Sequence, residues 1–208
     1  FLTEYQDKAY ADRYAALLKR VQEVERKRTP TANGVVLAVA KNAFKLMAYK
    51  DEYEVARLFS DGSFIKKIKQ QFEGDYKIEF NLAPPLISKK DPITGQLKKR
   101  TFGPWMMSAF RLLAKLKVLR GTAFDIFGKT EERKTERNLI EQYFGLVEMV
   151  LSNLNNENHQ TSIELLSLPE QIRGYGHVKE KAIKMVKSKE RQLLERFNHP
   201  ELSRTAAE

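Results

Sequence analysis

Apolar residues recur at steps of three and four along most of this 208-residue chain, which is the spacing of amphipathic α-helices. The clearest example lies in residues 1–28, where one predicted face carries five apolar side chains: Tyr10, Tyr14, Leu17, Val21 and Val24. Other predicted helices lie at about 33–50, 51–59, 63–72, 104–120 and 130–154, in a shorter segment ending at Leu168, and at 177–197. The pattern predicts a mainly α fold with about 7–8 helices.

The helical period is interrupted between Tyr76 and Leu82, where apolar and polar residues alternate as in a half-buried strand. The turn predicted at 91–95 has the sequence DPITG, in which proline fixes φ and glycine permits positive φ. The segments 86–90 and 97–102 flank this turn. We therefore expect a small antiparallel hairpin, or a three-stranded insertion, around 75–102. A sheet this small needs a helical surface to cover its apolar face.

No internal repeat or low-complexity linker divides the chain. We therefore expect a single α-rich module over residues 1–200, with the β insertion at 75–102, and a flexible tail at 201–208. No apolar run approaches the roughly 20 residues that cross a bilayer, and no signal peptide precedes the first helical pattern. These features predict a cytoplasmic protein without a membrane partner. The start at Phe1 rather than methionine is interpreted as the start of a piece of a longer polypeptide.

The residue types exclude several chemistries. The chain has no cysteine, so it cannot form disulfides, ligate iron–sulfur clusters through thiolates or perform thiol catalysis. The sequence FGKT at 127–130 resembles the end of a phosphate-binding loop, but Ala123 stands where that motif requires glycine. His177 and Glu180 share a predicted helix face, but Lys181 occupies the position where the inverted zinc motif requires histidine. We predict no catalytic residue, metal site or cofactor in this chain.

The positive charge is concentrated in one segment. The chain has a net charge of +10, and residues 63–120 contain thirteen Lys and Arg residues but only four Asp and Glu residues. The hairpin would bring five of these cations together, and they form the candidate site for an anion or partner: Lys89, Lys90, Lys98, Lys99 and Arg100. A local field of this kind steers anionic partners, whereas lysines on an edge strand also prevent aggregation. Both interpretations stay open.

Two further surfaces are candidates for contacts. Four cations recur at helical spacing near the C-terminus, namely Lys181, Lys184, Lys187 and Arg191, a pattern usual for a solvated helix face. The alternative function for the whole chain is a stand-alone basic helical module that binds nucleic acid. The aromatic residues follow core spacing and do not alternate with the cations, which argues against that function. The turn-rich sequence RGYGH, with Arg173, Tyr175 and His177, is a candidate interdomain contact.

Six stretches, taken in order, resemble the C-terminal domain of the fused bacterial indolepyruvate ferredoxin oxidoreductases. The resemblance runs from Phe1 to about Phe197, and the stretches are FLTEYQDKAYADRY, NAFKLMAYKDEYEVARL, FNLAPPLISKKDP, RTFGPWMMSAFRLLAKLKVLRGTAFDIFG, ERNLIEQY and LPEQIRGYGHVKEKA. That family belongs to the 2-oxoacid:ferredoxin oxidoreductases, and no catalytic residue can be carried over from this domain of it.

The resemblance implies a parent enzyme that oxidatively decarboxylates 2-oxo acids to acyl-CoA and passes electrons to ferredoxin. Thiamine diphosphate with Mg²⁺, iron–sulfur clusters and CoA as co-substrate would serve that enzyme, which we expect to be a homo-oligomer. This chain lacks the cysteines and the diphosphate-binding pattern that such catalysis needs. The catalytic domains are therefore expected upstream in the same polypeptide. This module would assemble or cap them, or dock acidic ferredoxin or CoA through its basic segment.

Overall fold

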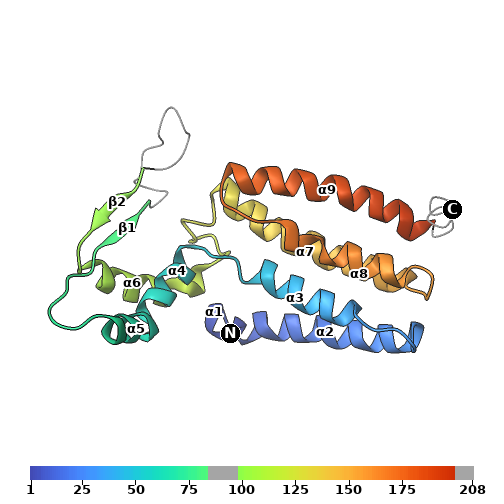
Figure 1. The fold of residues 1–208 in the computed structure, drawn as a ribbon, viewed down its shortest axis with the longest axis horizontal. Coiled ribbons are helices and arrows are strands. Elements are labelled where there is room, and N and C mark those ends of the chain that lie inside the picture. The colour runs from blue at the N-terminus through green and yellow to red at the C-terminus, as the bar shows by residue number, and fades with distance from the viewer. Residues whose placement is uncertain (84–97, 200–208) are drawn as a thin grey trace. The chain divides into compact units, whose positions relative to one another are not determined.

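The computed structural model describes residues 1–83 and 98–199 (Figure 1). The chain packs as two compact units: unit 1 comprises Phe1–Tyr49 and Glu131–Glu208, and unit 2 comprises Lys50–Thr130. Unit 2 therefore interrupts unit 1 in sequence. The mainly α fold with a small antiparallel hairpin is confirmed. The described residues form nine α-helices, two short 3₁₀ helices and two strands.

Unit 1 is a bundle of helices around one apolar core. Its elements are α1 (Leu2–Tyr5), α2 (Lys8–Arg28), α3 (Val35–Met47), α7 (Glu131–Asn153), α8 (His159–Ser167), the 3₁₀ helix η2 (Leu168–Gln171) and α9 (His177–Asn198). Helix α3 packs against α2, α7 and α8, and α9 packs against α8 and η2 (Figure 1). The predicted apolar face of the first helix supplies Leu17 and Val21 to this core.

The single helix predicted for residues 1–28 is two helices in the structure. The break occurs at Asp7, whose carboxylate accepts a hydrogen bond from the backbone N–H of Tyr10 at 2.8 Å. An aspartate in this position satisfies a backbone donor that has no partner within the helix, so α2 starts there.

A carboxylate from α2 caps α3. The N-cap of α3 is Gly34, which has no side chain to accept hydrogen bonds from the first turn. The carboxylate of Glu25 takes the place of a capping side chain. Its Oε1 accepts a hydrogen bond from Val35 N at 2.8 Å, and its Oε2 accepts one from Val36 N at 3.0 Å. The ring Nε2 of His159, on α8, lies 3.2 Å from the same Oε1. Glu25 is buried, so this carboxylate joins three helices of unit 1 away from water.

Unit 2 contains α4 (Glu52–Ser60), α5 (Ser63–Gln71), β1 (Phe80–Leu82), β2 (Arg100–Phe102), α6 (Met106–Lys115) and the 3₁₀ helix η1 (Leu116–Leu119). Helix α4 packs against α5 and α6. The core is rich in aromatic rings: Phe59 stacks on Phe110 at 5.1 Å between centroids and meets Phe80 edge-on at 5.4 Å. Such pairs add stability beyond their buried area.

The hairpin lies against this aromatic core. Strands β1 and β2 pair antiparallel with Phe80 opposite Phe102, and Phe80 is buried among residues of α4 and α6. The expected helical cover for the small sheet is therefore present. The alternation predicted from Tyr76 holds from Ile78 onward, whereas Tyr76 is exposed and precedes the regular strand. The turn predicted at 91–95 lies outside the described residues.

Candidate functional site

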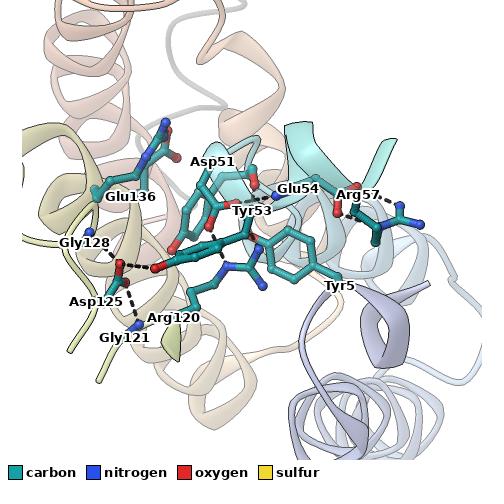
Figure 2. Close-up of polar contacts among 12 residues, drawn as sticks. Tyr5, Asp51, Tyr53, Glu54, Arg57, Arg120, Gly121, Asp125, Gly128 and Glu136 are labelled. Atoms are coloured by element: carbon teal, nitrogen blue, oxygen red, sulfur yellow. Dashed lines mark hydrogen bonds and ion pairs between the residues drawn. The ribbon is translucent and has the colours of Figure 1, made fainter. Parts of the chain in front are cut away.

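A buried ion pair ties the first helix of unit 2 to the segment after α6 (Figure 2). Arg120 Nη2 donates to Asp51 Oδ1 at 2.9 Å, and Arg120 Nε donates to Asp51 Oδ2. Asp51 also caps α4, because its Oδ1 accepts from Glu54 N at 2.8 Å. Arg120 is one of the thirteen cations of segment 63–120, but its charge is neutralised inside unit 2. It is therefore unavailable to an outside partner.

A second buried carboxylate fixes the loop that follows Arg120. Asp125 accepts hydrogen bonds from Gly121 N and Gly128 N, both at 2.8 Å, and from the Tyr53 hydroxyl at 3.1 Å (Figure 2). Burial first, and then the charge of Asp125, raise the pKa of Tyr53 above its usual value. The phenol therefore stays protonated and continues to donate. With three donors bound, this carboxylate holds the loop in place.

Exposed cations lie on the hairpin and on α6, both of which precede this anchored loop in the sequence. Lys99, Arg100, Arg111 and Lys115 are exposed and form no ion pair with a carboxylate of the described residues. Between positions 98 and 130 the sequence holds only one carboxylate, the buried Asp125. We call Lys99, Arg100, Arg111 and Lys115 the cationic surface.

The other predicted cations have different environments. Lys98 is exposed next to Lys99, whereas Lys89 and Lys90 lie outside the described residues. Lys77 is paired with Glu79 at 2.8 Å, so it adds little net charge. The proposal that the five hairpin cations form one site therefore stays a prediction, while exposure of Lys98, Lys99 and Arg100 is a structural finding.

Trp105, Leu112 and Leu116 do not face the core. Their steps of seven and four are the spacing of an apolar helix face, which would predict burial, but they are 62%, 63% and 39% exposed, respectively. The buried face of α6 instead carries Met106 and Phe110. The helix is apolar on both faces, so its spacing alone could not identify the face that packs inward. The exposed face is a functional candidate that the sequence interpretation missed.

The turn with Arg173, Tyr175 and His177 belongs to unit 1, and the three residues are exposed. Arg173 Nε donates to the backbone oxygen of Glu170 at 3.1 Å, and His177 is the first residue of α9. Gly174 has a φ of +89°, and a Cβ there would lie 2.6 Å from Val178 Cγ1, so the turn requires glycine. A role for this turn as an interdomain contact stays a prediction.

The described residues contain a small cavity and no cluster of metal-ligating His, Cys, Asp and Glu side chains. Among them, no three His, Cys, Asp or Glu side chains are grouped so as to hold a metal ion. A cavity of about 40 Å³ in unit 1, lined by apolar residues such as Leu46, Tyr143 and Ile183, is far smaller than the roughly 300 Å³ of a typical ligand pocket. Within the described ranges, no helix has the length and apolar character to cross a bilayer.

The fold defines the class of this protein: a mainly α-helical module with a small two-stranded antiparallel sheet. Residues 1–192 match the family described as "Family of unknown function (DUF6537)", and the chain belongs to this family. Neither a curated protein nor a solved structure matches the chain.

Proposed function

We propose that this chain is a non-catalytic module of a 2-oxoacid:ferredoxin oxidoreductase and that its cationic surface docks an acidic partner, ferredoxin in the first place. The parent enzyme would oxidatively decarboxylate an indolepyruvate-type 2-oxo acid to an acyl-CoA. Its thiamine diphosphate, Mg²⁺ and iron–sulfur clusters would be held by other parts of the polypeptide, and it would act in the cytoplasm. The oxidoreductase assignment rests on the sequence resemblance from Phe1 to about Phe197.

The docking assignment rests on one observation: Lys99, Arg100, Arg111 and Lys115 are exposed in unit 2 without a described carboxylate partner. Like charges held on one compact unit repel one another, and an anionic partner would offset that repulsion. Uncompensated cations also raise the association rate of an acidic protein, by about 10- to 1000-fold in known cases. Electron-transfer encounters suit this mode, because they are small, short-lived and electrostatically steered.

The test measures ferredoxin reduction by the complete gene product that contains this sequence. Lys99→Glu with Arg100→Glu reverses two charges of the cationic surface. The matched control, Lys181→Glu with Lys184→Glu on α9, makes the same change in net charge on exposed residues of unit 1. We expect the first variant to lower kcat/KM for a two-[4Fe–4S] ferredoxin by about tenfold or more at low salt, and the control to change it little.

The salt dependence of the rate distinguishes electrostatic attraction of ferredoxin from other effects of the substitutions. The difference between the two variants should shrink as the Debye length falls from about 10 Å at 0.1 M to about 3 Å at 1 M. Turnover with an artificial electron acceptor should not change.

An unaltered ferredoxin rate and salt slope in the Lys99/Arg100 variant would end the docking proposal. Failure of the complete gene product to oxidise any 2-oxo acid would end the oxidoreductase assignment. Sequence-dependent affinity for a nucleic acid would favour the alternative binding function.

A further inference from the structure

The outer face of α6, together with the residues that flank its two ends, carries three exposed apolar side chains, which we call the apolar stripe. Trp105, Leu112 and Leu116 follow one another at steps of seven and four, which places them on one side of the helix. All three are at least 39% exposed. Single exposed apolar residues are ordinary, but a row of three large ones along one helix is the kind of feature that marks a binding surface.

The stripe is held in position by the packing of unit 2. On the opposite side of α6, Met106 and Phe110 are buried in the aromatic core, which fixes the rotation of the helix. The Trp105 ring meets the Phe102 ring edge-on, with 6.0 Å between centroids. The indole is therefore buttressed by β2 although most of it is accessible. A preorganised side chain of this kind loses little conformational entropy on binding.

Two members of the cationic surface border the stripe. Arg111 and Lys115 are one turn apart and lie on the same flank of it, by helical geometry. Neither forms an ion pair with a described carboxylate, and the outer face itself carries no acidic residue between Trp105 and Leu116. A surface that combines an apolar row with a cationic border is complementary to a protein segment with carboxylates beside apolar side chains.

We infer that the α6 outer face, formed by Trp105, Arg111, Leu112, Lys115 and Leu116, binds an acidic, amphipathic segment of a partner protein. This inference deepens the proposed docking function and rests on it, since it specifies what the acidic partner must carry. The cations would speed the encounter, and the buried apolar contacts would slow dissociation. Trp105 is the expected anchor, because tryptophan and arginine dominate the binding energy of protein interfaces.

The experiment uses the 208-residue chain and two peptides of equal negative charge. One peptide forms an amphipathic helix with glutamates beside a leucine stripe, and the other is polyglutamate. Trp105 is the only tryptophan, so its fluorescence reports on this face without labelling. We expect the amphipathic peptide to bind at least about tenfold more tightly, and to shift the Trp105 emission to shorter wavelength as water leaves the indole.

Matched leucine variants test the site. Leu112→Ala should weaken binding of the amphipathic peptide by about fivefold or more, as a hot-spot contact would, with the salt slope unchanged. Leu37→Ala is the control, because Leu37 is also on a helix and is 72% exposed, but in unit 1. It should leave binding unchanged. Arg111→Glu should reduce binding mainly at low salt.

Three results would overturn the inference. The first is equal affinity for the two peptides, since charge alone would then explain binding. The second is absence of binding by both peptides. The third is an emission shift with phosphatidylserine–phosphatidylcholine vesicles or single-stranded DNA but not with the amphipathic peptide. Binding of this peptide together with an unchanged ferredoxin rate in the charge-reversal variant would keep the binding site and remove only ferredoxin as its partner.

Discussion

Replacing Arg120 by alanine should destabilise unit 2 severely. Arg120 and Asp51 are 5% and 3% exposed, and the guanidinium forms two hydrogen bonds with the carboxylate. The substitution would leave the Asp51 charge buried without its cation. Breaking a buried pair in this way costs about 3–5 kcal/mol. A folded unit of about 80 residues has roughly 4–12 kcal/mol of stability in total, so the loss is a large fraction of it.

An exposed ion pair supplies the control. Arg20 Nη2 lies 2.7 Å from Glu148 Oε2 in unit 1, and both side chains are largely exposed to solvent. Arg20→Ala should change the stability of unit 1 little, because water solvates both groups when the pair is lost. The same residue type is removed in both variants, so the difference between them measures burial of the ion pair.

Hydrogen exchange followed by mass spectrometry checks the prediction unit by unit. Arg120→Ala should reduce protection in α4 and α6, and the double variant Asp51→Asn with Arg120→Leu should recover part of it. The asparagine keeps an acceptor for the α4 cap but removes the buried charge. A cost below about 1 kcal/mol for Arg120→Ala, or a double variant no more stable than the single one, would refute this reasoning.

Three further predictions concern both units. Glu25→Gln should cost about 1–3 kcal/mol in urea unfolding, because one amide oxygen cannot accept both α3 N–H groups; an unchanged midpoint would contradict the capping role. Gly34→Ala should lower the free energy of unfolding by a similar amount, about 1–3 kcal/mol, because φ is +128° and the new Cβ would lie 2.7 Å from Ile163 Cδ1. Adding Ile163→Val to this variant removes the clashing Cδ1, so it should recover the part of the loss that comes from the clash and not the part that comes from the backbone. Burial raises the pKa of Tyr53 and Tyr143 in the folded protein above the value of about 10 that tyrosine has in the unfolded chain. The stability that the two buried phenols contribute is therefore complete below a pH of about 10 and is lost as the pH rises above it, because the unfolded chain ionises first. In an alkaline titration, their tyrosinate absorbance should appear only as the circular dichroism of the helices disappears.

The sequence predicted the helices well because apolar spacing and terminating residues are local signals. The helices expected at 33–50 and 177–197 are α3 (Val35–Met47) and α9 (His177–Asn198). The alternation before Leu82 likewise located β1, because one face of the hairpin is buried against helices. These features depend on neighbours a few residues away, which a single sequence displays.

The remaining features depend on partners that are far apart in sequence. Asp51 meets Arg120 across 69 positions, and Glu25 meets His159 across 134. No local pattern distinguishes a buried arginine of this kind from a solvated one, so Arg120 was counted among the available cations. The exposed row that begins at Trp105 could not be recognised from the sequence for a related reason. Helix α6 has apolar residues on two faces, and tertiary packing decides which one is covered.

The interruption of unit 1 by unit 2 has a consequence for synthesis on the ribosome. Helices α2 and α3 emerge before the long insertion, whereas α7, α8 and α9 emerge after it. At 5–20 residues per second, an insertion of about 80 residues delays the second half by roughly 4–16 s. During that interval Val21 and Val39 lack most of their final neighbours. At its end unit 2 is complete and able to fold, whereas α7, α8 and α9 have still to be made. Unit 2, whose synthesis begins second, would therefore fold first. Once folded, it would hold the two segments of unit 1 closer together, which would reduce the entropy cost of joining them.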